Sequence, residues 1–519
     1  MNRNKIMGLL ALLLFNFAVK AQLSSAQVDS LVQKALVTFD VPGIAVAIVK
    51  DGRVIHSKGY GVRSLQTKAS VTDHTLFGIA SNSKAFTAAG LAILVDEGKL
   101  RWDDKVVDLI ADFKMYNPYV TQEFTVRDLL THRSGLGLGA GDLMIWPDST
   151  TVTKAELIHN LRFLKPVSGF RTKFDYDNLL YVVAGEVLAK VSGMTWEDFI
   201  EQRIMRPLGM TESAADYSRL KDNRNSIDAH APVNGKITVI GKEFTSIANA
   251  AGGIWSNVAE MSKWAVMQLN DGKYGENLSK KIFTAASHQE MWSPQTIMGG
   301  GSPYNTHFNS YGLGWFLSDV NGYLQASHTG GLGGIVTQVT LIPELKLGII
   351  VLTNQESGAA FTAITNSIKD GYFGIKGKDR IKQYRTNELK SHEEGEAITK
   401  KVWADIAAAQ NKNIAKPDLD IYTGKFRDDW FGEINVVKNG ADLWFQAIKS
   451  PKLKGKMSFY KGNTFIVKWN DSSMNADAYV IFALGKDGQA SGIKMEAISP
   501  LTDFSYDFQD LDFSRINKK

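Results

Sequence analysis

The order of its strand-like and helical segments most strongly constrains how this chain can fold. Residues 43–61 are typical of two strands joined as a hairpin, with Asp51-Gly52 as the turn. Helical patterns lie before this hairpin at 27–38 and after it at 81–97, 126–131 and 180–191. Strand patterns return at 314–319, 323–330 and 336–354. Strands at both ends of a region can share one sheet with helices inserted between them, so we expect an α+β domain.

Two changes in texture divide the rest of the chain, which at 519 residues is too long for one compact core. Residues 376–416 are dense in charge and poor in large apolar side chains, which favours a charged, partly helical linker. Residues 417–519 form short alternating runs separated by Asn-Gly, Gly-Asn and Asp-Gly pairs, typical of a small antiparallel barrel or sandwich. The main domain is therefore expected over residues 22–375.

The first 21 residues have the composition of a secretory signal peptide. Two basic residues precede a short apolar run at 6–19, and Val19 and Ala21 fit the small-residue cleavage pattern. We expect cleavage after Ala21 and a periplasmic or secreted mature protein, with an uncleaved anchor as the alternative. Removing the three basic residues of the signal lowers the formal charge from +5 to +2, which gives no electrostatic case for nucleic-acid binding.

Cysteine and histidine usage excludes several chemistries. The chain has no cysteine, so disulfides, a cysteine nucleophile and thiolate metal sites are excluded. Its nine histidines form no His-Glu-x-x-His motif, which leaves a zinc hydrolase with little support. We expect neither a metal nor a cofactor.

The pattern Ser-x-x-Lys occurs four times, starting at Ser81, Ser218, Ser458 and Ser491. Only Ser81 lies where an apolar strand-like segment runs into a helix, and Lys84 falls on its face of that helix. A helix N-terminus supplies free N–H groups and positive potential, and burial lowers a lysine pKa. A neutral amine beside a serine can accept its proton. The alternative is that Ser81 is a helix cap with a chance lysine nearby.

Two further motifs each occur once. Tyr176-Asp177-Asn178 is the only Tyr-x-Asn, and His328-Thr329-Gly330 is the only His-x-Gly. Either motif alone is weak, since a tyrosine before a helix is more often a packed aromatic and a glycine run is often a plain loop. Their single occurrence in the order Ser-x-x-Lys, Tyr-x-Asn, His-Thr-Gly favours one shared site.

Together these motifs resemble the serine β-lactamase and penicillin-binding-protein superfamily, and most closely its class C β-lactamase-like branch of D,D-peptidases, D-aminopeptidases and family VIII esterases. The resemblance covers residues 41–354 and includes the strings VRDLLTHRSGL, IMRPLGMTES and AAGGIWSNVAEMSKW. It implies a β-lactamase/transpeptidase-like domain, an antiparallel sheet flanked by helices with a helical subdomain. The tail is similar to the lipocalin-like barrels appended to some members.

The resemblance also implies catalytic roles. Ser81 would attack a carbonyl and form an acyl-enzyme, with Lys84 and Tyr176 sharing the proton transfers; which of the two is the acylation base stays open. Asn178 would bind the lysine or the substrate amide. The N–H groups of Ser81 and Gly331 would form the oxyanion hole, where one donor is worth roughly 3–4 kcal/mol in other hydrolases.

The third motif departs from that of β-lactamases in this branch, which carry Lys-Thr-Gly. His328, Thr329 and Gly330 would bind substrate, but a histidine is only partly charged near neutrality and holds a substrate carboxylate less well than lysine. This argues against efficient β-lactam hydrolysis. Of the neighbouring residues, His132 is expected to fix a loop, and Asp177 to be a solvated or capping acid.

The sequence therefore predicts an exported serine hydrolase that cleaves an amide or ester bond, a peptidase, amidase or esterase. There are three alternatives. The protein could be a true β-lactamase, or a penicillin-binding or sensor protein that is acylated without turnover. It could also be a ligand-carrying barrel attached to a degenerate hydrolase. The expected partner is a small-molecule or peptide substrate, cell-wall-derived or a β-lactam. Nucleic acid and a membrane anchor after signal cleavage are not expected, and oligomers stay open. The tail domain could cover the active site, support oligomers or add stability.

Overall fold

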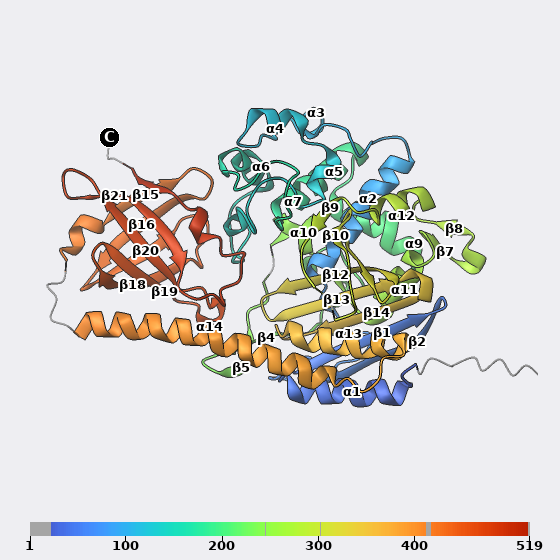
Figure 1. Cartoon of the computed structure of the whole chain (residues 1–519). Coiled ribbons are helices and arrows are strands. Elements are labelled where there is room, and N and C mark those ends of the chain that lie inside the picture. Colours follow the sequence, from blue (N-terminus) through green and yellow to red (C-terminus); the bar gives the residue numbers. More distant parts are fainter. Residues whose placement is uncertain (1–21, 244, 302, 412–416, 517–519) are drawn as a thin grey trace, which may run out of the picture.

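The computed structural model describes residues 22–243, 245–301, 303–411 and 417–516. The predicted signal peptide, residues 1–21, lies outside them. A sheet-and-helix body and a β-barrel are joined along one side by a long helix (Figure 1). No single helix in the described part of the chain is long and apolar enough to cross a membrane.

The larger body is built on an eight-stranded antiparallel sheet in the order β2-β1-β14-β13-β12-β11-β10-β9. Strand β1 pairs with β14, with Ile44 opposite Thr353 and Val49 opposite Gly348, which confirms that both ends of this region share one sheet. The strands are β1 (Gly43–Lys50), β2 (Arg53–Gly61), β9 (Thr296–Met298), β10 (Asn309–Tyr311), β11 (Phe316–Val320), β12 (Tyr323–Leu332), β13 (Ile335–Ile342) and β14 (Leu347–Thr353).

Helices cover both faces of this sheet, and β1 shows how the sequence specifies this. Its side chains alternate between two cores, since successive residues of a strand point to opposite faces. Ile44, Val46 and Ile48 enter the core formed with α1 (Ser25–Thr38) and α13 (Gly358–Phe373). The intervening Ala45, Ala47 and Val49 face the other core, where α11 (Val258–Gln268) packs on β1 and β14.

The central helix of the larger body is α2 (Ser83–Asp96), which is buried along nearly its whole length. It follows a short 3₁₀ turn, Ala80–Asn82, so the predicted helix over 81–97 begins with a tighter turn at Ser81. Helix α2 packs on α7 (Leu179–Ser192). Shorter helices complete this subdomain: α3 (Val106–Leu109), α4 (Pro118–Glu123), α5 (Val126–Leu129), α6 (Lys154–Asn160), α8 (Trp196–Ile200), α9 (Arg206–Leu208), α10 (Asn249–Gly252) and α12 (Ala285–Met291).

The segment predicted as a partly helical linker contains one continuous helix, α14 (Arg380–Asn411). Few of its residues are apolar, but two of them anchor it at its ends. Ile381 packs in the core beneath α1 and α13, and Ile406 packs on the barrel against Ile466 and Ile498. The helix is therefore a packed spacer between the two bodies.

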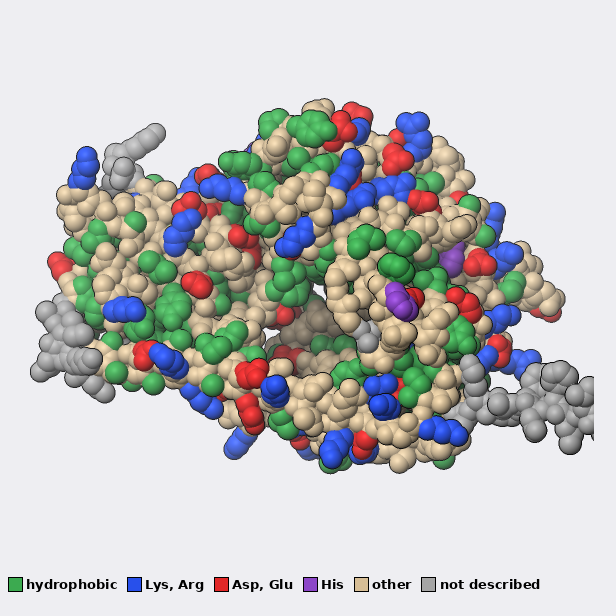
Figure 2. Space-filling view, viewed as in Figure 1, with side chains coloured by type: hydrophobic (Ala, Val, Ile, Leu, Met, Phe, Trp, Pro, Cys, Tyr) green, Lys and Arg blue, Asp and Glu red, His purple; other side chains and the backbone are tan. Residues whose placement is uncertain are grey.

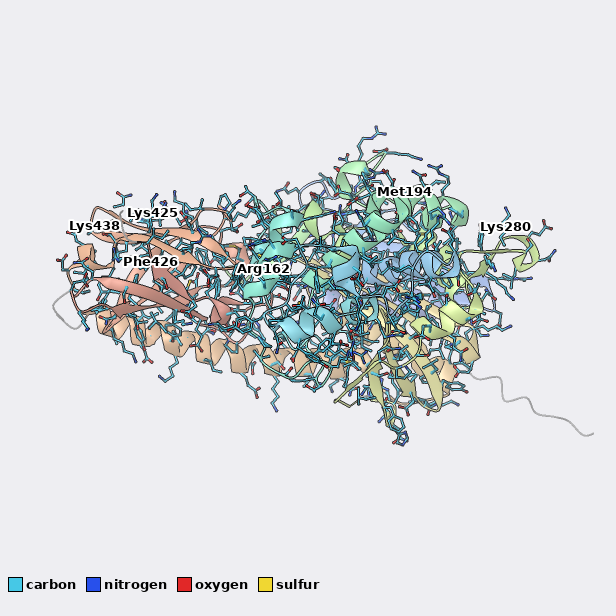
Figure 3. The ribbon with its side chains drawn as sticks, turned by 90° about the horizontal axis from the view of Figure 1, so that it is seen from above. Arg162, Met194, Lys280, Lys425, Phe426 and Lys438 are labelled. Atoms are coloured by element: carbon cyan, nitrogen blue, oxygen red, sulfur yellow. The ribbon has the colours of Figure 1, made fainter. Side chains whose placement is uncertain are left out.

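The C-terminal body is a closed barrel of eight antiparallel strands, which confirms the predicted small barrel. Its interior is filled by its own side chains, among them Phe426, which is labelled in Figure 3. Phe445 and Trp469 are buried there as well. A filled interior disfavours a ligand-carrying barrel. The strands are β15 (Gly424–Asp428), β16 (Gly432–Asn439), β17 (Asp442–Ala447), β18 (Lys454–Lys461), β19 (Thr464–Trp469), β20 (Ala478–Leu484), β21 (Ala490–Ala497) and β22 (Phe513–Arg515).

The barrel docks on the helical subdomain, and the surface is hollowed between the two bodies (Figure 2). The Asn160 amide donates to the Trp430 carbonyl at 2.8 Å, and Lys449 forms an ion pair with Glu156 at 2.8 Å. The deepest contact is made by Asp507, whose carboxylate accepts the N–H groups of Gly141 (2.6 Å) and Leu143 (3.0 Å). Asp507 lies in the loop between β21 and β22, and this loop brings the barrel to the candidate active site.

Candidate active site

Ser81 and Lys84 meet at the N-terminus of α2, as their spacing predicts. The Lys84 Nζ lies 3.0 Å from the Ser81 Oγ. Lys84 is fully buried, whereas Ser81 is partly exposed and lines a cavity of about 530 Å³. Ser81 therefore faces the space that a substrate would enter, and Lys84 approaches it from the protein interior.

The other contacts of Lys84 determine what its amine can do. Its Nζ also donates to the Asn178 Oδ1 at 2.8 Å and to the Ala251 carbonyl at 3.0 Å. Burial lowers the pKa of Lys84 to about 7, against the opposing charges of Asp142 and Asp177. A neutral amine has two N–H groups, which the two carbonyl oxygens can accept, so its lone pair is left facing Ser81. This geometry suits an amine that accepts the serine proton.

Asn178 is held by a second shell of groups that reaches the barrel. Its Nδ2 donates to the Asp142 Oδ2 at 2.8 Å, which fixes Oδ1 toward Lys84. Asp142 is fully buried, and Ser505 of the barrel loop lies beside it. Burial raises the pKa of Asp142 well above its usual range. A chain of contacts thus runs from the barrel to the amine of Lys84.

Tyr176 lines the cavity with Ser81. Its hydroxyl lies next to Ser81, and the Lys84 Nζ lies 4.8 Å from the centre of its ring. Burial raises the pKa of Tyr176 above its usual value, so the phenol stays protonated at neutral pH. A phenolate base would need a lowered tyrosine pKa, whereas burial raises the pKa of Tyr176.

His132 positions Tyr176 by stacking and by a backbone hydrogen bond. Its ring centre is 4.2 Å from that of Tyr176, and its Nδ1 accepts the Asp177 N–H at 3.1 Å. Burial lowers the pKa of His132 well below its usual value, so the ring is neutral. Asp177 caps α7 by accepting the Leu179 N–H at 2.9 Å. Asp177 is fully buried, so of its two predicted roles the capping one is right and the solvated one is wrong.

His328 is buried on β12, and its charge differs from the expectation. Its Nδ1 donates to the Thr329 carbonyl at 2.6 Å and its Nε2 accepts from the Tyr311 hydroxyl at 3.0 Å. Burial, followed by the charge of Lys84, lowers the pKa of His328 to about 3. The prediction of a partly charged histidine was therefore wrong, and Thr329 is the exposed residue of this motif.

Gly330 lets strand β12 approach the turn that carries Ser81. A Cβ at Gly330 would lie 2.3 Å from the Ile79 carbonyl oxygen and 2.9 Å from the Ala80 Cβ. Gly331 lines the cavity with Ser81, and a Cβ there would meet no other atom within 4 Å among the described residues. The backbones of Ser81 and Gly331, the predicted oxyanion-hole residues, are thus brought together by the close packing at Gly330.

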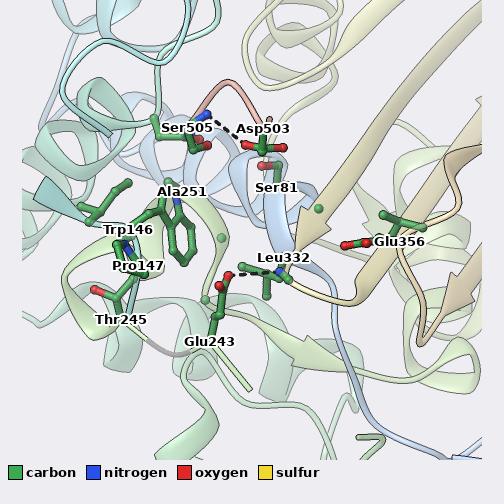
Figure 4. A pocket seen from close by; sticks show the side chains of 18 of the residues that line it. Ser81, Trp146, Pro147, Glu243, Thr245, Ala251, Leu332, Glu356, Asp503 and Ser505 are labelled. Atoms are coloured by element: carbon green, nitrogen blue, oxygen red, sulfur yellow. Dashed lines mark hydrogen bonds between the residues drawn. The ribbon is translucent and has the colours of Figure 1, made fainter. Parts of the chain in front are cut away.

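The barrel completes the cavity wall. Phe504 packs edge-on against Tyr176 with ring centres 6.0 Å apart, and Tyr506 lines the same space. Asp503 and Ser505 of the same loop also line it (Figure 4). The tail domain was expected to cover the active site, to support oligomers or to add stability. The position of this loop favours the role of covering the active site.

Several site residues had no motif in the sequence. Ala251 lies in the string AAGGIW, which was a usable signal, but Asp142 and Ser505 reach the site only through tertiary packing. The other Ser-x-x-Lys serines lie elsewhere: Ser218 is exposed beside Asp216, and Ser458 and Ser491 lie on barrel strands. Within the described ranges, no three His, Asp or Glu side chains gather as a metal site would require.

Comparison with known proteins agrees with this geometry. The family described as Beta-lactamase matches residues 28–370. The chain belongs to the beta-lactamase family. A second family, described as a domain of unknown function (DUF3471), matches residues 408–515, which include the barrel.

Two curated relatives of this beta-lactamase family chain are informative. Unguisins hydrolase ungD' of Aspergillus campestris is 29% identical over 485 residues, which cover 89% of this chain and 87% of that protein. Protein flp of Staphylococcus aureus is 28% identical over 344 residues, 64% of each chain. The family and its hydrolase relative support a hydrolase.

Solved structures show the fold. The octameric penicillin-binding protein homologue from Pyrococcus abyssi superposes with a TM-score of 0.60 at 21% identity, covering 95% of this chain and 100% of that one. The β-lactamase/transpeptidase-like fold is thereby confirmed. The class C-like branch and the lipocalin-like character of the barrel stay predictions.

Proposed function

We propose that this protein is a serine hydrolase that cleaves an amide or ester bond through an acyl-enzyme on Ser81. The observation that carries the proposal is the geometry at Lys84. Its two carbonyl partners, Asn178 and Ala251, account for the N–H groups of a neutral amine. The lone pair is then left for Ser81, whose Oγ lies 3.0 Å from the Lys84 Nζ.

Acylation follows from these positions. Neutral Lys84 accepts the proton of Ser81, and the serine Oγ forms a bond to the substrate carbonyl carbon. The negative charge that develops on the carbonyl oxygen is stabilised by the N–H groups of Ser81 and Gly331. The pKa of Lys84 near 7 places the base close to the working pH, where general-base catalysis is most efficient.

Protonated Tyr176 is placed to serve the leaving group. Its hydroxyl donates a proton to the departing nitrogen or oxygen as the carbon–leaving-group bond breaks, and the Lys84 ammonium, which holds the serine proton, restores it. In deacylation a water attacks the ester carbonyl and its proton passes to Lys84. The bond between the carbonyl carbon and the Ser81 oxygen then breaks, and Lys84 gives the proton to that oxygen. The acid product is released and the amine is neutral again.

A panel of chromogenic esters, amides and a β-lactam tests the proposal, with Ser81→Ala setting the background. Turnover of an ester or amide above that background is the expected result. Preferential turnover of the β-lactam would make the chain a true β-lactamase. Stoichiometric acylation with no turnover would make it a penicillin-binding or sensor protein. The relative named as an unguisins hydrolase supports including peptide amides.

We expect activity to rise with pH through about 7. Burial lowers the pKa of Lys84 to about 7, so its amine is increasingly neutral, and able to accept the serine proton, as the pH increases. kcat/KM measured from pH 5 to 9 should climb toward a plateau with a midpoint near 7. A flat profile in this range, with the protein shown to stay folded by circular dichroism, would contradict a lysine base.

Asp177 provides the control, because burial raises its pKa to about 7 as well. Asp177→Asn keeps an oxygen for the α7 cap but removes a negative charge that raises the Lys84 pKa. If Lys84 is the group that titrates, the midpoint moves to lower pH in this variant. If Asp177 were the group, the rising limb would disappear.

Phe504→Ala should weaken substrate binding more than chemistry. Phe504 is the barrel side chain that stacks on Tyr176 at the cavity wall. We expect KM for an aromatic ester to rise by roughly 3- to 10-fold, the order of one aromatic contact, with kcat changed less. Ile481→Ala is a matched control, since Ile481 is also on the barrel and is as exposed as Phe504, 40% against 39%. An unchanged KM would contradict a role of the barrel in the site.

We also propose that the protein is exported. The support is the basic and apolar composition of residues 1–21. When the protein is expressed with this segment, we expect to find it outside the cytoplasm, with the intact mass of a chain that starts at Gln22. A full-length mass in the cytoplasm or in a membrane fraction would contradict the proposal.

A further inference from the structure

The wall of the active-site cavity carries an excess of negative charge. Glu243, Glu356 and Asp503 line it, together with Asp216 and Asp471. Among the described lining residues, Lys452 is the only lysine or arginine, and Asp148 forms an ion pair with it. With His328 neutral, the described wall offers no free cation to a substrate carboxylate.

Two of these carboxylates are held at the turn between β12 and β13. The Gly333 N–H donates to the Glu243 Oε2 at 3.1 Å, and the Gly334 backbone donates to Glu356. A Cβ at Gly333 would lie 2.8 Å from the Glu243 Cδ, so glycine is what lets the carboxylate pack this closely. The turn begins two residues beyond Gly331, roughly 7 Å along the strand from the oxyanion-hole backbone.

The third carboxylate comes from the barrel. Asp503 accepts the Ser505 N–H within its own loop, and it extends toward the cavity from the side opposite Glu243 (Figure 4). Burial raises the pKa of Glu243 to about 7 and also raises that of Glu356, and the charge of Asp503 adds to both effects. Like charges brought together out of water favour a bound cation.

The hydrogen bonding of Glu243 is incomplete in the part of the chain that the structure describes. The Gly333 N–H is its one hydrogen-bond donor there, although an ionised carboxylate has about four lone-pair sites. The remaining sites lie at the wall of a cavity of about 530 Å³ that also holds Ser81. A carboxylate in this position is available to a ligand.

We propose that the substrate carries a protonated amine, which Glu243 binds beside the glycine turn. Glu356 and Asp503 add negative charge to the same cavity wall, and Ser81 attacks a carbonyl held at the oxyanion-hole backbone, roughly 7 Å from the turn along β12. The inference deepens the proposed function and rests on it. It names the substrate class as a cationic amide or ester, the reverse of the carboxylate-bearing β-lactams.

Three esters built on one ring test this preference, and the aminomethyl and ethyl members of the set are isosteric. They are the 4-nitrophenyl esters of trans-4-(aminomethyl)-, trans-4-ethyl- and trans-4-(carboxymethyl)cyclohexanecarboxylic acid, whose rigid ring sets the charge several ångströms from the carbonyl. We expect kcat/KM for the aminomethyl ester to exceed that for the ethyl ester by about 10-fold or more, and the carboxymethyl ester to be poorest. The amine preference should shrink as salt increases.

Variants assign the preference to the acidic wall. Glu243→Gln and Glu356→Gln should each reduce the ratio of aminomethyl to ethyl turnover severalfold, whereas Asp222→Asn, at an exposed ion pair with Arg224, should leave it unchanged. A wild-type ratio near or below one would overturn the inference. If the ethyl ester is still hydrolysed in a Ser81-dependent way, the proposed function survives that failure.

A binding measurement covers the case in which no ester is turned over. Calorimetry with Ser81→Ala compares the carboxamides of the aminomethyl and ethyl acids. Binding of the aminomethyl amide at least about 10-fold tighter, and lost with Glu243→Gln added, supports the amine subsite whatever the rate of hydrolysis. Equal binding of the two amides overturns it.

Discussion

Lys84→Met is expected to reduce kcat/KM by about 10³- to 10⁴-fold while the protein stays folded. Methionine has a similar length but no amine, so the Ser81 proton loses its acceptor, and a positioned base contributes up to about 10⁴-fold. The substitution also leaves Asn178 Oδ1 and the Ala251 carbonyl without their donor, which costs about 1–3 kcal/mol for each buried group. Ester hydrolysis below the melting transition measures the effect.

Lys369 offers a matched control for this variant. It is a second buried lysine, and burial lowers its pKa to about 7. It lies on α13 and donates to Gln325 on β12, away from the cavity. Lys369→Met should lower stability and leave kcat/KM within about 3-fold, since it removes no acceptor for the serine proton. Activity above about a tenth of wild type in Lys84→Met would contradict the lysine-base mechanism.

Gly330→Ala is expected to reduce kcat/KM by about 100-fold, because the new methyl group would collide with the Ile79 carbonyl and the Ala80 side chain. Either strand β12 or the turn that carries Ser81 must shift, and a misplacement of about 1 Å can cost that much rate. Overpacking should also lower the free energy of unfolding by about 1–3 kcal/mol.

The control for Gly330 is another glycine with free space around it. A Cβ at Gly299 would meet no atom within 4 Å among the described residues, and its backbone is not left-handed. Gly299→Ala should keep wild-type kinetics and melting temperature. Wild-type kcat/KM in Gly330→Ala would show that the close approach of β12 to Ser81 has no part in activity.

The parts of the fold and site that could be predicted from sequence depend on local patterns. The apolar runs of β1 and β14 and the Asp51-Gly52 turn identified strands, and the chain order between them favoured a shared sheet. The three-residue spacing of Ser81 and Lys84 placed both at one helix start. Single-occurrence motifs identified Tyr176 and His328, which the fold brings into the same cavity.

The remaining features depend on contacts between distant segments. Asp507 accepts the N–H of Gly141, which lies 366 residues away in the chain. Nothing in the sequence around either residue indicates this contact. The neutral state of His328 depends on its burial, which its motif does not reveal. The linker proved to be one helix, because Ile381 and Ile406 give its two ends separate cores to pack in.

The most direct test of the account is the intact mass of the protein after treatment with a fluorophosphonate, beside Ser81→Ala treated in the same way. The account predicts one adduct on the wild-type protein and none on the variant, because Ser81 lines the cavity and has the buried Lys84 amine placed to accept its proton. An adduct that persists in Ser81→Ala, or no adduct on folded wild-type protein, would contradict an activated nucleophile at Ser81.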